Sequence, residues 1–286
     1  MDNHASLPSY TVSQNEALEY VAAFLKENLK LSGLYCFGSQ QTAKSKHCAI
    51  SGNTSNQNHY HFYLLAFCPE FKENAVGELA DVLKTKSNGH YTMTLLLHKA
   101  SAVRQLTAQQ SYFFQKVMQS GVLYKHPVVP PVVTVERNPK RNVENIRAYW
   151  HNRNRIAETF LESQSQIEGF DTQPIQESML HMAIENITLA LIHTFLGYRP
   201  MHFSLGYLFD LCNLFCSLPD EIFPRNTHEE LKIFQLLSQH LSKLRTVKLK
   251  PTDFVLTELL QRRCYEFHER ATLLIEAEIK RLEETK

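Results

Sequence analysis

A change in sequence pattern near the middle of the chain most constrains its fold. Before residue 126, short aromatic and aliphatic runs alternate with helical patterns, whereas after Asn142 helical periodicity continues almost to the end. Between them, residues 126–131 (HPVVPP) hold three prolines in six positions, which disfavours a helix and marks a linker. A chain of 286 residues has room for two ordinary domains. The sequence therefore predicts a first domain over residues 1–126, a linker over residues 127–141 and a second domain over residues 142–286.

The first half of the chain predicts a mixed α/β domain. Runs of aromatic and aliphatic residues are typical of strands, and they cover residues 34–37, 62–67, 92–97 and 122–124. Helical spacing of apolar residues predicts helices at residues 16–29, 75–83 and 109–120. Residues 43–58 are polar and rich in turn-forming residues, so we expect a loop there. The order helix, strand, strand, helix, strand indicates an α/β or α+β fold for this domain.

The second half predicts an all-α domain. Helical periodicity covers residues 143–166, 176–196, 205–215, 228–244 and a last helix from about residue 251 nearly to the end. Gly197 and Pro200 mark the end of the second helix, and Thr227-x-x-Glu230 forms a capping box at the start of the fourth. Five amphipathic helices indicate an antiparallel helical bundle, so we expect an α+β protein with a helical second domain.

Charge and cysteine content limit the possible functions and the cellular location. Thirty basic residues balance 29 acidic ones, so any surface that binds nucleic acid must be local. The one basic concentration is residues 136–155, which are either a solvated helix face or a phosphate-contacting surface. The six cysteines form no C-x-x-C pair and suit buried thiols in a reducing compartment. With no apolar run near the ~20 residues of a membrane span and no secretory pattern in residues 1–14, we expect a cytoplasmic protein.

A motif near the start of the chain suggests nucleotide chemistry. The segment LYCFGS is an apolar strand that ends in Gly38 and Ser39, and a second strand then carries His59 and His61. This arrangement resembles the minimal nucleotidyltransferase fold, which is related to DNA polymerase beta. In that family the Gly-Ser turn holds a nucleotide phosphate, and Asp-x-Asp on the second strand holds two magnesium ions.

His59 and His61 stand where the resemblance expects the two aspartates. Magnesium prefers oxygen ligands, so the resemblance implies a first domain that has lost its chemistry. Gly38 and Ser39 either still bind a nucleotide through backbone N–H groups or form a simple tight turn. The two histidines are either hydrogen-bonded side chains or, with His47 and Cys48, ligands of a zinc ion.

The second half carries its own resemblance. The run LHMAIE at residues 180–185 is followed by Leu196-Gly197 and by His202 with Leu205 three residues later. This pattern is similar to the HEPN family (higher eukaryotes and prokaryotes nucleotide-binding), over residues 142–286. Members of that family are often fused to, or encoded beside, minimal nucleotidyltransferases, so the two resemblances support each other.

Many HEPN proteins are metal-independent RNases that work as dimers through Arg-x(4–6)-His in a late helix, and here the motif is Arg263 and His268. Histidine can take the proton of a 2′-hydroxyl, and arginine can hold the scissile phosphate. The two lie about 140° apart around a helix, so two helices of a symmetric dimer would converge them better than one. They should flank an apolar stripe formed by Leu260, Cys264, Phe267 and Ala271.

Two further residues bear on this site. Glu185 either orders Arg263 or His268 from a neighbouring helix or lies at the solvent edge of its own helix. Arg270 stands where HEPN toxins that are silenced by nucleotidyltransferase partners carry tyrosine, so we expect no self-nucleotidylation.

Three functions follow from these patterns, and none requires a cofactor. The first is RNA cleavage by Arg263 and His268 in a homodimer. The second is non-catalytic binding of RNA or a nucleotide, and the third is an interaction role in a toxin-antitoxin or defence system.

Overall fold

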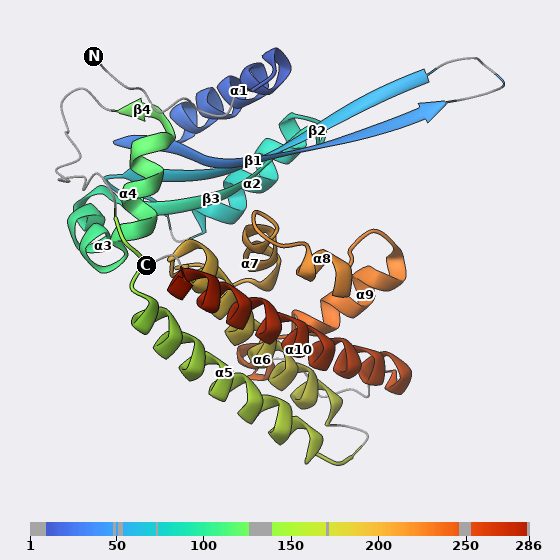
Figure 1. Ribbon diagram of the computed structural model, residues 1–286. Coiled ribbons are helices and arrows are strands. Elements are labelled where there is room, and N and C mark those ends of the chain that lie inside the picture. Colours follow the sequence, from blue (N-terminus) through green and yellow to red (C-terminus); the bar gives the residue numbers. More distant parts are fainter. Residues whose placement is uncertain are drawn as a thin grey trace. The chain divides into compact units, whose positions relative to one another are not determined.

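The computed structural model describes residues 10–47, 50, 54–72, 74–125, 139–169, 172–245 and 253–284. Its contacts divide the chain into two compact units, residues 1–140 and residues 141–286. The division falls inside the linker expected at residues 127–141, of which residues 127–138 lie outside the described part. The fold is α+β, with strands in the first unit and helices in both (Figure 1).

The first unit contains the strands and helices that the sequence predicts, most of them with longer bounds, and a short helix at residues 103–109 that was not expected. Its elements are α1 (Val12–Asn28), β1 (Gly33–His47), β2 (Thr54–Cys68), α2 (Ala75–Lys86), β3 (Tyr91–Lys99), a 3-10 turn (Ala100–Ala102), α3 (Val103–Gln109), α4 (Ser111–Ser120) and β4 (Val122–Lys125). Helix α1 begins at Val12, four residues before the predicted start, because Thr11 and Gln14 form a capping box there. The expected order of helix, strand, strand, helix and strand is confirmed.

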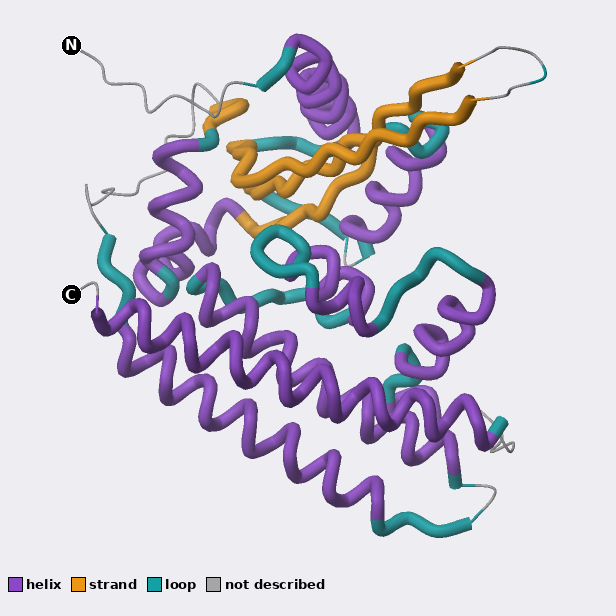
Figure 2. Tube along the Cα trace, turned by 45° about the vertical axis from the view of Figure 1, so that its right-hand side comes forward, coloured by secondary structure: helices purple, strands orange, loops and turns teal. Residues whose placement is uncertain are grey.

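The four strands form one mixed sheet in the order β3-β2-β1-β4. Strand β1 pairs antiparallel with β2 and β4, whereas β2 and β3 run parallel because α2 crosses between them. One face carries Phe62 and Leu64 into a core shared with α1 and α2. On the other face, Phe113 and Phe114 of α4 make ring contacts with Phe37 and Phe67, respectively. Figure 2 shows the strands of this unit with helices packed around them.

The loop predicted at residues 43–58 is wrong. Strand β1 continues to His47, and β2 begins at Thr54, with Ala43 opposite Asn58 and His47 opposite Thr54. Figure 1 shows the two strands extending well beyond the helices of this unit. These polar residues pair through their backbones because each strand continues directly from a buried segment that is already paired. The pairing therefore extends along residues that offer no apolar face to a core.

A buried histidine on the covered face predicts acid sensitivity of the first unit. His98 contacts the rings of Phe67 and Phe114, and burial lowers its pKa from 6.5 to about 4. Between these values the unfolded chain binds a proton that the folded chain excludes. The free energy of unfolding should therefore fall by about 2 kcal/mol from pH 7 to pH 5 through this ring.

Urea unfolding of a His98→Phe variant at the two pH values tests this prediction. The variant should lose that part of the pH dependence, while a His90→Phe variant of the exposed His90 should keep it. An equal pH dependence in the wild type and His98→Phe would contradict the burial argument.

The second unit consists of helices around α6. Its elements are α5 (Val143–Ser165), α6 (Gln173–Leu196), α7 (Leu205–Cys212), α8 (Leu218–Ile222), α9 (His228–Leu237), a 3-10 turn (Leu241–Arg245) and α10 (Phe254–Glu284). Helix α6 contacts α5, α7, α9 and α10, and it is buried nearly all round, as a central helix must be. The five long helical patterns are confirmed as helices, but the third ends at Cys212 and the fourth breaks after Leu237.

Two helix ends follow the local chemistry of the sequence. Gly197 ends α6 in the left-handed conformation (φ 69°), which costs glycine nothing. Thr227 and Glu230 form the predicted capping box of α9. The short helix α8 was not expected, and it starts with Pro219 in its first turn.

Helix α6 is the one helix in the described ranges with the length and apolar composition of a membrane span. Of the most apolar 18-residue stretch of this helix, 78% is buried. Core helices of globular domains have the same composition.

Candidate functional site

Arg263 and His268 lie on opposite edges of a buried stripe of α10. The expected stripe is confirmed, because Leu260, Cys264, Phe267 and Ala271 are all fully buried. His268 contacts α5 through Asn154. Arg263 lies near α9, where backbone N–H groups of Asn226 and Thr227 lower the pKa of Glu230 and the charge of Arg263 adds to the effect. One chain therefore does not bring the two motif residues together.

A hydrogen-bonded amide orients the ring of His268. The distance from His268 Nε2 to Asn154 Oδ1 is 2.8 Å. Asn154 Nδ2 donates to Glu158 Oε1 at 2.8 Å, so the amide oxygen faces the ring and accepts from it. The neutral ring then carries its proton on Nε2 and keeps the lone pair on Nδ1. This is the tautomer of a base that acts through Nδ1.

Burial also favours the uncharged form of His268. Desolvation lowers the pKa of this half-buried ring, although the charges of Glu158 and Glu269 partly oppose the shift. Since the ordinary value is 6.5, the ring is predominantly neutral at pH 7. A neutral histidine can accept a proton, which a charged one cannot.

Arg263 offers a donor that the described residues do not use. Its side chain is half-buried, and its Nη1 atom is buried without a hydrogen-bond partner. An unpaired guanidinium nitrogen in such a place is costly unless an acceptor binds it. A phosphate oxygen is a suitable acceptor, because arginine–phosphate hydrogen bonds are charge-assisted.

Glu185 does not have the supporting position that the sequence suggests. It is buried on α6, and its carboxylate oxygen Oε2 lies 3.6 Å from Nε2 of His181, one turn earlier. Asn154 orders His268 instead. Sequence reasoning missed Asn154 because it lies 114 positions away from His268, in another helix. The only local signal is that it lies on the predicted helix 143–166.

Gly38 and Ser39 lie inside a strand, so the predicted turn is wrong. Gly38 pairs with Tyr63 and Ser39 pairs with Phe62, after a β-bulge between Cys36 and Gly38. Gly121 lies against this bulge so closely that a Cβ there would be 1.9 Å from the carbonyl oxygen of Cys36. The bulge allows β1 to bend without ending, and that is why a strand followed by Gly-Ser did not become a loop.

The two histidines of the second strand are joined through threonines of β3. His61 Nδ1 lies 2.8 Å from Thr92 Oγ1, and His61 Nε2 lies 2.9 Å from Thr94 Oγ1. His59 Nε2 lies 3.0 Å from Thr92 Oγ1 as well. Both rings share one face of the sheet and are hydrogen-bonded, as the interpretation without a metal expected. Cys48, named as a further zinc ligand, lies outside the described residues.

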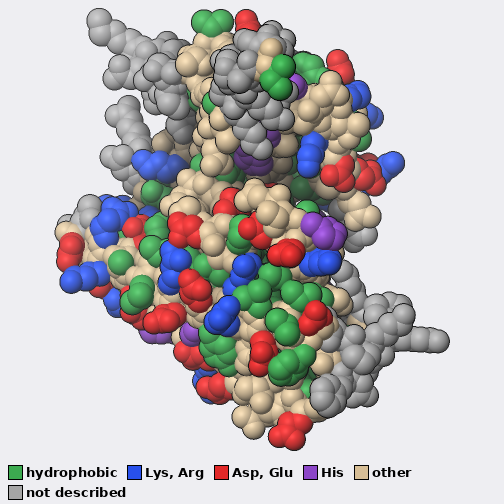
Figure 3. All heavy atoms as spheres, turned by 90° about the vertical axis from the view of Figure 1, so that its right-hand side faces the viewer, with side chains coloured by type: hydrophobic (Ala, Val, Ile, Leu, Met, Phe, Trp, Pro, Cys, Tyr) green, Lys and Arg blue, Asp and Glu red, His purple; other side chains and the backbone are tan. Residues whose placement is uncertain are grey.

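Basic side chains of the segment 136–155 form ion pairs within the second unit. Arg141 forms a buried ion pair with Glu278 at 3.1 Å, and Arg147 pairs with Glu283. On the face shown in Figure 3, basic and acidic side chains are interspersed and form no single-sign patch. These contacts favour the structural interpretation of this segment over a phosphate-binding surface.

One group in the described part of the chain could hold a metal ion, namely His181, Glu185 and His240. It shares no residue with Arg263 and His268. Comparison with protein-family models and with curated proteins finds no match for this chain.

Proposed function

We propose that the second unit is a metal-independent endoribonuclease of the HEPN type. The single observation that carries the proposal is the environment of His268, a neutral ring that Asn154 holds with its Nδ1 lone pair available. Arg263 adds a buried cationic donor without a partner. Together they supply a base and a phosphate ligand, which is what cleavage next to a 2′-hydroxyl needs.

The proposed reaction is an internal transesterification of RNA. Nδ1 of His268 takes the proton of the 2′-hydroxyl, whose oxygen attacks the adjacent phosphorus. The bond from phosphorus to the 5′ oxygen breaks, leaving a 2′,3′-cyclic phosphate and a 5′ oxygen that takes a proton from water and becomes a hydroxyl. Arg263 donates to the phosphate oxygens and offsets their growing negative charge.

A second copy of the chain is part of the proposal. The two motif residues face different neighbouring helices: His268 is hydrogen-bonded to Asn154 of α5, and the charge of Arg263 acts on Glu230 of α9. A two-fold dimer would place Arg263 of one copy beside His268 of the other, as an isologous interface can. We therefore propose that the protein acts as a homodimer.

The first unit acts, in this proposal, as a degenerate nucleotidyltransferase-like module with a regulatory or binding role. Thr92 and Thr94 engage His59 and His61 where that family has acidic metal ligands. Nucleotidyl transfer is not part of the proposed function, because imidazoles replace the oxygen ligands that magnesium needs.

A cytoplasmic location is also proposed. The five described cysteines are all free thiols: Cys36, Cys68, Cys212, Cys216 and Cys264. Burial raises the pKa of each of them, which keeps them protonated and unreactive. Such thiols suit a reducing compartment.

Non-catalytic RNA binding is the second candidate, and one contact set favours it. The guanidinium groups of Arg153 and Arg199 lie 5.0 and 4.9 Å from the ring centre of Tyr149. Arginine and aromatic side chains together line many grooves that bind single-stranded nucleic acid. Binding of RNA without cleavage would favour this candidate.

A cleavage assay on structured and single-stranded RNA in EDTA tests the proposed function. The wild-type protein should cleave, and His268→Ala should be slower by about 10²–10⁴-fold, the usual contribution of a general base. His151→Ala, on the exposed side of α5, is the matched control and should retain activity. Equal cleavage by the wild type and His268→Ala would overturn the proposal.

A further inference from the structure

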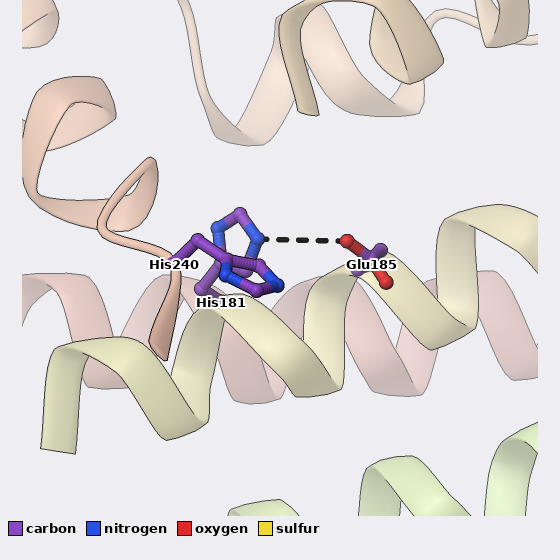
Figure 4. Close-up of side chains that lie close together, drawn as sticks. All are labelled: His181, Glu185 and His240. Atoms are coloured by element: carbon purple, nitrogen blue, oxygen red, sulfur yellow. Dashed lines mark ion pairs between the residues drawn. The ribbon is translucent and has the colours of Figure 1, made fainter. Parts of the chain in front are cut away.

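A cluster of three metal-binding side chains lies in the second unit, apart from the motif residues of α10. His181 and Glu185 are one turn apart on α6, and His240 follows α9. His181 and Glu185 are buried, and His240 is half-buried. Figure 4 shows the two imidazole rings close together and the carboxylate facing His181.

The spacing of the donor atoms suits one small cation. The three donor atoms all lie within 4.8 Å of one another, and His181 Nε2 lies 3.6 Å from Glu185 Oε2. That distance is too long for a hydrogen bond. Two ligands bound tetrahedrally at about 2.0–2.1 Å are about 3.3–3.4 Å apart, so a small closure would complete the geometry.

His181 is already oriented as a metal ligand. Its Nδ1 donates to the carbonyl oxygen of Leu237 at 2.8 Å, which leaves the lone pair on Nε2. That Nε2 is buried and has no hydrogen-bond partner. Metal-binding histidines typically donate their other ring N–H to a backbone carbonyl in this manner. A metal ion would satisfy an acceptor that is otherwise buried at a cost.

His240 can complete the set after a change of tautomer. The backbone N–H of Ser242 donates to His240 Nδ1 at 3.0 Å, and the Ser242 hydroxyl lies 2.9 Å from the same atom. Metal binding through Nε2 would move the ring proton to Nδ1, which would then donate to the hydroxyl in place of the bond from the backbone N–H. The ring of His240 already lies edge-on to that of His181, with their centres 5.2 Å apart.

We propose that His181, Glu185 and His240 bind one zinc ion. Two imidazole nitrogens and one carboxylate oxygen form a donor set that zinc favours, whereas magnesium and calcium favour oxygen alone. A water molecule would fill the fourth position, as in other sites with two histidines and a glutamate. The ion would tie the segment after α9 to the central helix α6. This proposal does not depend on the RNase proposal.

The test is zinc binding to the full-length protein after removal of metals with a chelator. Wild-type protein dialysed against a zinc buffer should retain about one zinc per chain by mass spectrometry of the metal. His240→Ala and Glu185→Gln should each weaken zinc binding by at least about 100-fold, more than the loss of an outer-shell partner causes. His228→Ala and His202→Ala alter exposed histidines and should bind zinc as the wild type does.

Two further readouts keep the test independent of folding. Glu185→Gln preserves the shape of the side chain, and circular dichroism of the metal-free variant should match that of the wild type. Cobalt in place of zinc should give the intense visible absorption of a four-coordinate site in the wild type and lose it in His240→Ala. The absence of zinc in the wild type, or equal zinc content in well-folded His240→Ala, would overturn the proposal.

Discussion

Mixing Arg263→Ala chains with His268→Ala chains is expected to restore about a quarter of the wild-type RNase activity that each variant lacks alone. Each variant by itself should be slower than wild type by about 10²–10⁴-fold. In a mixed dimer, one composite site keeps Arg263 from one copy and His268 from the other, while the second site has neither. Random pairing makes about half of the dimers mixed, each with one of two sites intact.

The measurement is the initial rate of RNA cleavage after the two variants are unfolded together and refolded. The control is a mixture of either variant with itself, treated in the same way. If Arg263 and His268 acted within one chain, no mixture would contain a complete site and the rate would stay at the level of the variants. The rate of the mixture therefore distinguishes a site shared by two chains from a site within one chain. A shared site is expected because Arg263 and His268 lie on opposite edges of the buried stripe of α10.

Replacing Glu278 by alanine is expected to lower the free energy of unfolding by about 3–5 kcal/mol. Glu278 forms a 3.1 Å ion pair with Arg141, and the side chains of both are less than a tenth exposed. Removing the carboxylate leaves the buried guanidinium of Arg141 without its counter-charge. Thermal and urea unfolding of the full-length protein measure the loss.

Glu283→Ala is the matched control on the same helix. Glu283 pairs with Arg147, but the two side chains are 41% and 44% exposed. An exposed pair contributes about 1 kcal/mol or less, so this variant should stay close to the wild type. A double variant with Glu278→Leu and Arg141→Met should regain much of the stability, because it removes both charges. Equal losses for Glu278→Ala and Glu283→Ala would contradict the role of burial.

Much of the helical unit follows from the sequence because its signals are local. The apolar stripe of α10 recurs at three- and four-residue steps, and all four of its predicted members are buried. The capping box at Thr227 and the glycine that ends α6 depend on residues within one turn. Short-range patterns of this kind are enough to place a helix and its buried face.

The candidate site could be predicted only in part. Periodicity places Arg263 and His268 on either side of the stripe, and the structure agrees. The partner of His268 is Asn154, which lies on another helix and far away in the chain. The sequence pattern His181-x3-Glu185 shows two donors on one face of α6, but the third donor, His240, comes from a separate segment.

The sequence by itself determined the two-part pattern of the chain, most helices, the core strands and the buried face of α10. Tertiary structure alone decided that β1 and β2 form a long antiparallel pair, that Gly38 and Ser39 lie within a strand, and that His240 lies beside His181 and Glu185. The physical reason is the distance along the chain between the residues that interact. Helical periodicity and caps depend on neighbours within a few residues, whereas strand pairing and side-chain clusters depend on contacts between segments that no local pattern specifies.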